Sequence, residues 1–184
     1  MYKMKVQKRN NSFEEVSFDK ILTRIKLLCY SDEFPKKLDI DPTIIAQKVC
    51  SELYDGVTTA ELDILSSETA IALYSGHLDY AELASRIIIS NHHKKTSSVF
   101  SDVITKLYEK EIIDTYLYDL VQANADLINS RIDYSRDYKL DFFGFKTLEK
   151  SYLLKCDGII VERPQNLYMR VALCIHRNNL NKAF

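Results

Sequence analysis

Residues 6–30 constrain the fold most, because their apolar spacing changes from the period of a strand to the period of a helix. Alternating side chains over residues 4–8 and 13–18 predict a β-hairpin that turns at residues 10–12. Asp19 is the expected N-cap of the helix that follows. The apolar residues of that helix share one face: Ile21, Leu22, Ile25, Leu28 and Cys29. A hairpin therefore leads directly into the positive end of a helix.

The same segment is strongly basic. Residues 1–30 hold seven Lys and Arg against three Asp and Glu, a net +4, although the whole chain has a formal net charge of −1. Backbone N–H groups and the dipole at a helix start favour anions, and neighbouring Lys and Arg strengthen the binding of a polyphosphate. The segment predicts either such an anion site or a basic hairpin that is merely solvated.

Three more helices are predicted before residue 96. Asp41 and Pro42 begin one, Thr58 with Glu61 forms a capping box at the start of another, and Asp79 with Glu82 begins the last. The expected inward faces are Ile45, Val49 and Leu53, then Leu62, Leu65, Thr69 and Leu73, and finally Leu83, Ile87 and Ile88. The pattern indicates four helices under a hairpin lid.

Residues 97–184 keep a mostly helical pattern. Residues 99–108 are expected to be helical after caps at residues 96–98, and Asp114 is expected to cap a helix that continues to residue 128. The tyrosine-rich run after residue 131 reads as a loop or short strand. Residues 145–151 are predicted to be helical, and residues 152–161 a hairpin turning at Asp157-Gly158. The expected inward face of the last helix, opened by Pro164, is Leu167, Val171, Cys174 and Ile175. The predicted class is mainly α with small β-hairpins.

Composition excludes several classes of protein. No apolar run approaches the roughly 20 residues of a membrane span, and the start is too polar for a signal peptide, so cytoplasmic residence is expected. The cysteines, Cys29, Cys50, Cys156 and Cys174, form no CxxC pair and are interpreted as buried, reduced thiols. His92-His93 lacks the spacing of a helical metal site, so no metal site is expected.

Five motifs occur in one order along the chain: VxKRxxxxEEVxFDKIxxRI, LYDGVTTAELDIL, DYAELASRIIISNHHK, FFGFKTLEKSYLLK and VERPQNLYMRVALCIH. Together they resemble the N-terminal end of the large subunit of a class I ribonucleotide reductase of the eukaryotic and viral type. Residues 1–96 are similar to the ATP-cone, a four-helix bundle capped by a hairpin that binds ATP or dATP. Residues 97–184 resemble the helical segment that leads to a catalytic barrel. That barrel is absent, so we expect a fragment of a larger reductase subunit.

The resemblance implies an allosteric nucleotide site and no catalytic residues in these 184 positions. The implied site residues are Lys8, Arg9, Glu14, Glu15, Val16, Ser17, Phe18, Asp19, Lys20, Thr59, Asp63 and Lys94. The implied effector is ATP or dATP, with Mg²⁺ and no metal held by the chain itself. The implied parent is an oxidoreductase, ribonucleoside-diphosphate reductase, whereas this chain alone is expected to be inactive. The implied partners are the radical-generating small subunit and further copies of the chain.

The turn at Asn10-Asn11-Ser12 departs from the family, which commonly has a glycine there. Asparagine is the next best residue for a left-handed turn. Two rival interpretations remain: a nucleotide-responsive regulator that binds nucleic acid, and a non-enzymatic helical interaction module. A pI of 6.4 and the absence of a CxxC disfavour the first, and we expect neither nucleic acid nor membrane as a partner. The second gives no reason for the match to the effector site.

Overall fold

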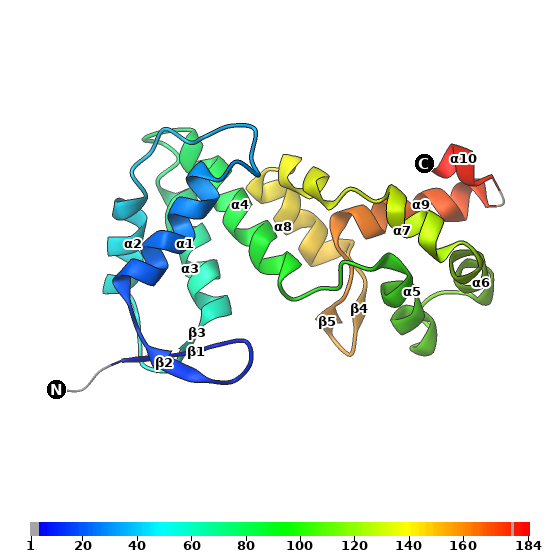
Figure 1. Ribbon diagram of the computed structural model, residues 1–184, viewed down its shortest axis with the longest axis horizontal. Coiled ribbons are helices and arrows are strands. Elements are labelled where there is room, and N and C mark those ends of the chain that lie inside the picture. Colours follow the sequence, from blue (N-terminus) through cyan, green and yellow to red (C-terminus); the bar gives the residue numbers. More distant parts are fainter. Residues whose placement is uncertain (1–3, 178) are drawn as a thin grey trace. The chain divides into compact units, whose positions relative to one another are not determined.

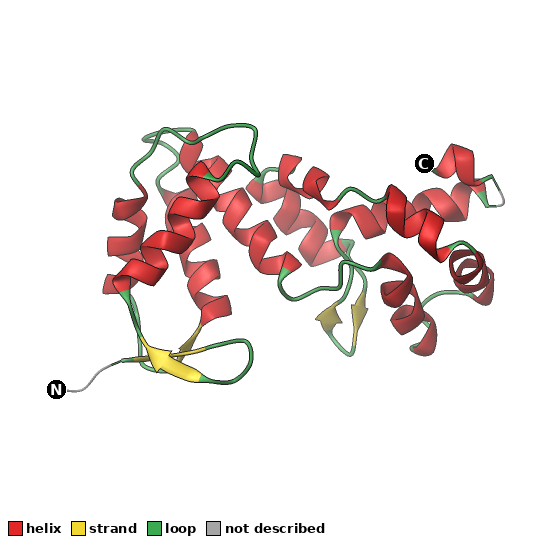
Figure 2. Ribbon diagram, in the orientation of Figure 1, coloured by secondary structure: helices red, strands yellow, loops and turns green. Residues whose placement is uncertain are grey.

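The computed structural model describes residues 4–177 and 179–184, so Lys3, which was counted in the basic segment, lies outside them. The chain divides into two compact units, Met1–Asn91 and His92–Phe184 (Figure 1). We call them the N-unit and the C-unit. Helices predominate in both, as predicted, with short strands between them (Figure 2). Within the described ranges we find no helix long and apolar enough to cross a membrane.

The N-unit contains the four predicted helices. Their bounds are α1 Phe18–Tyr30, α2 Pro42–Ser51, α3 Thr59–Ala72 and α4 Asp79–His93, the last of which continues into the C-unit. The buried apolar side chains of these helices include Ile21, Ile25, Leu28 and Cys29 from α1, Ile45, Ala46 and Val49 from α2, Ala70 from α3, and Leu83, Ala84, Ile87, Ile88 and Ile89 from α4. The predicted inward faces of α1, α2 and α4 are largely confirmed; Leu22 and Leu53 are only half-buried.

The predicted hairpin is present and belongs to a three-stranded sheet. Strand β1 (Lys5–Gln7) pairs antiparallel with β2 (Phe13–Glu15) and parallel with β3 (Val57–Thr58), which the sequence pattern did not reveal. Asn11 adopts a left-handed φ of 63° in the turn. Because β2 and β3 lead almost directly into α1 and α3, the sheet lies at the positive ends of both helices (Figure 1).

Helix starts in the N-unit follow the capping rules, with one correction. The Asp41 side chain accepts a hydrogen bond from the N–H of Thr43, and Thr58 with Glu61 forms the predicted capping box. Helix α1, however, is capped by Ser17, whose hydroxyl accepts from the N–H of Lys20, and not by Asp19. Ser17 still has extended backbone angles, whereas Asp19 already lies in the first helical turn. There its carboxylate interacts favourably with the helix dipole.

The predicted inner face of α3 is wrong. Of the four residues expected to face inward, only Thr69 is buried; Leu62, Leu65 and Leu73 are half-buried. The buried residues are Asp63, Ser66, Ser67, Thr69 and Ala70. The two serines satisfy their hydroxyls on carbonyls of their own helix, at 2.7 and 2.8 Å. Helix α3 thus turns small polar side chains and one carboxylate toward its neighbours.

The C-unit is a chain of short helices with one hairpin. Its elements are α5 Phe100–Glu109, α6 Thr115–Ala123, α7 Ala125–Arg131, the 3-10 helix η1 Tyr134–Lys139, α8 Phe142–Ser151, β4 Lys155–Cys156, β5 Ile159–Ile160, α9 Pro164–His176 and α10 Leu180–Ala183. Its core is Phe100, Val103, Ile104, Leu107, Leu117, Val121, Ile128 and Leu173. The predicted turn is confirmed: Asp157 and Gly158 have φ of 51° and 80°.

Several details of the C-unit differ from the expectation. Asp114 does cap α6, but that helix ends at Ala123 and α7 begins two residues later. The N-cap of α5 is Val99, without a side-chain bond, and not a residue of 96–98. The tyrosine-rich run forms η1, whose N-cap Asp133 accepts from the N–H of Ser135. An aspartate cap therefore makes a turn of helix where a loop or strand was predicted.

Helix α9 and the cysteines bring two further corrections. On α9, Leu167 is buried as expected, but Val171, Cys174 and Ile175 are exposed, and Leu173 supplies the core contact. The four cysteines are free thiols, but only Cys29 is fully buried. Burial raises the pKa of the Cys29 thiol to about 12.

Candidate functional site

Six charged side chains gather where the hairpin meets α1 and α3. The cations are Lys8, Arg9, Lys20 and Arg24, and the carboxylates are Glu14 and Asp63. With four positive and two negative side chains, this cluster has a net charge of +2. Each carboxylate bridges two cations, so the cluster consists of two neighbouring triads.

The first triad is centred on Asp63, which is only 6% exposed. Arg9 Nη2 lies 3.2 Å from Oδ2 of this carboxylate, and Arg24 Nε lies 3.2 Å from Oδ1. The three residues come from the hairpin, α1 and α3, which are distant in sequence. A carboxylate removed from water needs such partners, because desolvation of an unpaired charge costs several kcal/mol.

Polar residues at the end of α4 hold both arginines. Arg9 Nη2 donates to Asn91 Oδ1 at 2.6 Å, and its Nη1 lies 3.5 Å from the hydroxyl of Thr59. Arg24 Nη2 donates to the Ser90 hydroxyl at 2.8 Å. The amide of Asn91 in turn donates to the carbonyl of Ala60 at 3.3 Å. These bonds therefore connect the Asp63 triad to the hairpin and to α1, α3 and α4.

The second triad is centred on Glu14 and is more open. Lys8 Nζ and Lys20 Nζ lie 2.6 and 2.9 Å from the same oxygen of this carboxylate. Their side chains are 42% and 64% exposed, so solvent screens both pairs. Hydrogen bonds from Lys8 and then Lys20 hold the pKa of Glu14 below its usual value, so Glu14 keeps its charge to a lower pH than a lone glutamate.

All but one of the remaining predicted residues lie where β2 leads into α1. Glu15, Phe18 and Asp19 are exposed, and Val16 and Ser17 are half-buried, all between β2 and the first turn of α1. Lys94 belongs to the C-unit, where it is exposed directly after α4.

Sequence reasoning missed one member of the first triad, Arg24, and two residues that hold its arginines, Ser90 and Asn91. Arg24 was recognisable, since it lies one helical turn after Lys20 on the same side of α1. Ser90 and Asn91 carry no charge, and their role depends on where α4 ends in space.

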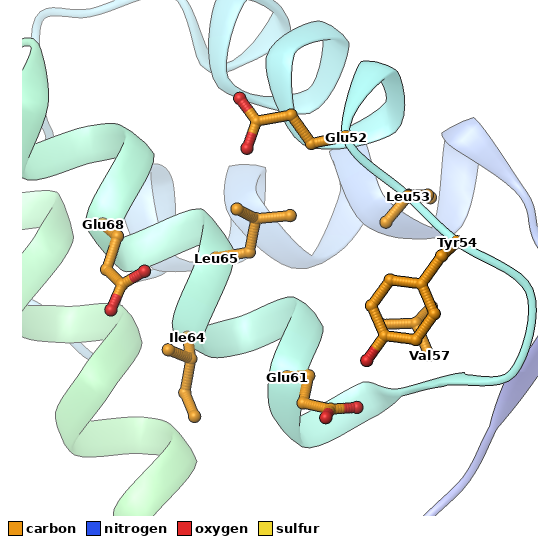
Figure 3. Close-up of a pocket in the computed structure, with 8 residues that line it drawn as sticks. All are labelled: Glu52, Leu53, Tyr54, Val57, Glu61, Ile64, Leu65 and Glu68. Atoms are coloured by element: carbon orange, nitrogen blue, oxygen red, sulfur yellow. The ribbon is translucent and has the colours of Figure 1, made fainter.

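A separate hollow of about 270 Å³ lies on the other side of α3, against the end of α2 and β3. It is lined by Glu52, Leu53, Tyr54, Val57, Glu61, Ile64, Leu65 and Glu68 (Figure 3). Figure 3 shows the Tyr54 hydroxyl directed toward Glu61, to which it is hydrogen-bonded. Three carboxylates make this hollow unsuitable for phosphate, and none of its lining residues belongs to the predicted nucleotide set.

The net positive charge of the cluster suits an anion such as a polyphosphate. Residues 4–95, which include the hairpin, α1 to α4 and both triads, match the family model described as ATP cone domain. The chain belongs to the ATP-cone family. ATP-cones are allosteric regulatory domains that bind nucleotides, so the matching family agrees with the chemistry of the cluster. Residues 138–183 match the ribonucleotide reductase, all-alpha domain.

Relatives of this ATP-cone chain are large subunits of one enzyme. It is 47% identical over 98% of its length to the ribonucleoside-diphosphate reductase large subunit of Danio rerio, and 46% identical, again over 98%, to the large chain of Schizosaccharomyces pombe. Identity to the large subunit of Vaccinia virus is 47% over 98% of the chain. The chain spans only 23–24% of the length of these three relatives.

Proposed function

We propose that this chain binds ATP or dATP as an allosteric effector at the two triads, without turning the nucleotide over. The observation that carries the proposal is the pairing of four cations with only two carboxylates, at the positive ends of α1 and α3. The proposed binding residues are Lys8, Arg9, Glu14, Glu15, Val16, Ser17, Phe18, Asp19, Lys20, Thr59, Asp63 and Lys94. Lys94 enters this set through the family resemblance alone.

Phosphate recognition is assigned to Lys8, Arg9 and Lys20. Lys8 and Lys20 already share one anionic oxygen, at 2.6 and 2.9 Å, and a triphosphate offers the same kind of oxygen with more charge. A bound triphosphate therefore competes with Glu14 for the two lysines. Mg²⁺ would accompany the phosphates and reduce their charge, with no metal ligand required from the chain.

Recognition of the base or sugar is assigned to Asp63. A carboxylate repels phosphate, but it accepts hydrogen bonds from an adenine amino group or a ribose hydroxyl. Thr59 lies one helical turn before Asp63 on α3 and on the same side, where its hydroxyl adds a second polar contact. Together they distinguish nucleotides, whereas the lysines respond to phosphate.

In its biological setting, we assign the chain to a ribonucleoside-diphosphate reductase large subunit in the cytoplasm. Residues 1–96 then form the regulatory ATP-cone and residues 97–184 the helical segment next to it. The subunit would act with a radical-generating small subunit in making deoxyribonucleotides for DNA synthesis. This assignment rests on the identity of 46–47% to reductase large subunits.

Calorimetry with ATP and with dATP tests the binding, and a reductase assay on the same sample tests the lack of turnover. We expect saturable binding of both nucleotides and no deoxyribonucleotide formation. Absence of heat at millimolar nucleotide would refute the effector site and leave the helical interaction module as the better interpretation. Deoxyribonucleotide formation by the chain alone would refute the claim that it is inactive.

Self-association is the second part of the proposal. The family resemblance implies assembly through the cone in response to dATP, with the exposed faces of the first and fourth helices as the contact. No described residue of α4 is exposed, so the part of that expectation that concerns α4 is wrong, and we propose the exposed face of α1 as the contact. Sedimentation velocity with and without dATP measures it. A monomer under both conditions would show that these 184 residues do not assemble by themselves.

A further inference from the structure

The two oxygens of the Asp63 carboxylate are bound by two arginines that lie in different kinds of backbone, one in a helix and one at a turn. Oδ1 is bound by Arg24, which lies in the second turn of α1, and Oδ2 is bound by Arg9, which follows β1 at the hairpin turn. The backbone at Arg24 is fixed because Ile21 and Ile25 of the same helix are buried in the core. Arg9 is fixed on a turn that precedes Asn11, a residue with a left-handed backbone.

We propose that Arg24 is the positioning residue that aims Asp63, and that it thereby sets how strongly the site discriminates between ATP and dATP. This inference rests on the proposed function, since it presumes that Asp63 contacts the nucleotide. A ligand hydroxyl or amino group competes with Arg9 for Oδ2, while Arg24 keeps Oδ1 in place. The carboxylate then meets either nucleotide in one fixed orientation.

The geometry of the guanidinium group supports this role. Arg24 Nε donates to Asp63 at 3.2 Å while its Nη2 donates to Ser90 at 2.8 Å, so the planar group spans α3 and α4. A lysine at this position keeps the charge, but a single Nζ cannot reproduce two donors fixed in one plane. Without the bond to Ser90, the side chain at position 24 is no longer anchored on α4 and does not hold Oδ1 of Asp63 in one place.

The same geometry separates Arg24 from the phosphate ligands. Lys8 and Lys20 have side chains 42% and 64% exposed and share a carboxylate that is itself accessible to solvent. The Arg24 side chain is 28% exposed, and two of its nitrogens are already committed to Asp63 and Ser90. Direct phosphate binding by Arg24 would break both bonds, including the one to Oδ1 of Asp63.

The test measures dissociation constants for ATP, dATP and inorganic tripolyphosphate on the full 184-residue chain. In Arg24→Lys we expect the ratio of the ATP and dATP constants to move toward one by about tenfold, the effect of losing a hydrogen bond to a charged group. Tripolyphosphate affinity should change by less than about threefold, because the charge is retained. Ser90→Ala should move the ratio in the same direction by a smaller factor. Lys26→Gln, an exposed change on the same helix, is the control and should leave the ratio unchanged.

Several outcomes would overturn the inference. A wild-type ratio in both Arg24→Lys and Ser90→Ala would show that Arg24 does not aim Asp63. An equal loss for all three ligands would make Arg24 a direct phosphate contact. If Arg24→Lys does not fold, as judged by circular dichroism, Ser90→Ala decides alone. Failure of the wild-type chain to bind any nucleotide would instead refute the proposed function, which is a distinguishable result.

Discussion

Asp63 in the N-unit and Glu162 in the C-unit are both buried carboxylates, but their surroundings differ. In the N-unit, Asp63 pairs with the side chains of Arg9 and Arg24, which remain 32% and 28% exposed. In the C-unit, Glu162 is fully buried and binds Arg170 Nε at 2.6 Å and the backbone N–H of Leu154 at 2.9 Å. Partners that water can reach exchange with a ligand at low cost, whereas a backbone N–H does not move without local unfolding.

A second buried carboxylate of the C-unit repeats this pattern. Asp137 is fully buried, accepts from the backbone N–H of Gln165 at 3.1 Å, and pairs with His93 Nε2 at 2.7 Å. His92 next to it donates from Nε2 to the carbonyl of Glu162 at 2.8 Å, and burial lowers its pKa, which favours the neutral ring. Buried Asp79 of the N-unit shares this pattern, since it accepts from the backbone N–H of Asp39 at 2.7 Å. The difference teaches that these three carboxylates fix backbone, whereas Asp63 holds two cations of the proposed nucleotide site.

The largest expected effect breaks this comparison on the structural side. Glu162→Ala should lower the free energy of unfolding by about 3–5 kcal/mol, since it leaves Arg170 and a backbone N–H without their partner. Urea unfolding followed by circular dichroism measures it. The control is Glu149→Ala, which removes a surface pair with Lys146 and should cost at most about 1 kcal/mol. Similar losses in the two variants would mean that burial of Glu162 is unimportant.

The next effect tests the ligand side. Asp63→Ala should weaken nucleotide binding by about 1.5–3 kcal/mol, the range for a hydrogen bond to a charged group. Asp63→Asn should change the preference between ATP and dATP more than the total affinity, because the amide keeps one acceptor oxygen. Calorimetry with both nucleotides measures these changes. Wild-type affinities and selectivity in Asp63→Ala would show that this carboxylate serves only to neutralise Arg9 and Arg24.

A smaller effect is expected at the open triad. Lys20→Ala should weaken ATP and dATP equally, by roughly three- to tenfold, because an exposed lysine acts on phosphate as a screened point charge. Titrations at two salt concentrations measure it, and the wild-type chain should lose more affinity on salt addition than the variant does. Unequal losses for the two nucleotides would place Lys20 near the sugar or base.

The smallest effect concerns two thiols and leaves nucleotide binding unchanged. Cys29 is fully buried with a pKa of about 12, so almost none of it is thiolate near neutral pH, whereas Cys174 is exposed on α9. Iodoacetamide with mass spectrometry should label Cys174 first and Cys29 only after denaturant is added. Early labelling of Cys29 would mean that the core of the N-unit opens readily.

Local rules predicted the elements whose causes lie within a few residues. The Asp41 cap, the capping box at Thr58 and the Asp157-Gly158 turn are each a contact between near neighbours, and all three are in the structure. The Asp19 cap failed because Ser17, two residues earlier, offered the same kind of oxygen while still in extended backbone. Adjacent capping residues compete, and propensity alone does not rank them.

Long-range causes were not predictable from the pattern. The inner face of α3 was placed on leucines, yet the buried position went to Asp63, because arginines from the hairpin and α1 reach it there. Strand β3 is two residues long and exists only because β1 lies beside it. The candidate site shows the same limit: its charged members other than Arg24 were named from the sequence, whereas Ser90 depends on the packing of α4 against α1.

At the start of α3, two neighbouring threonines have separate roles, so each can be substituted without changing the role of the other. Glu61 takes both the N–H and the hydroxyl of Thr58, so that residue is occupied with starting the helix. The hydroxyl of Thr59, one position later, is turned instead toward Arg9. Exchanging Thr58 for serine therefore adjusts helix stability, while exchanging Thr59 adjusts the contact with Arg9 in the proposed nucleotide site. A sensor built on the proposed nucleotide site is thus tuned in affinity at Thr59 and in stability at Thr58.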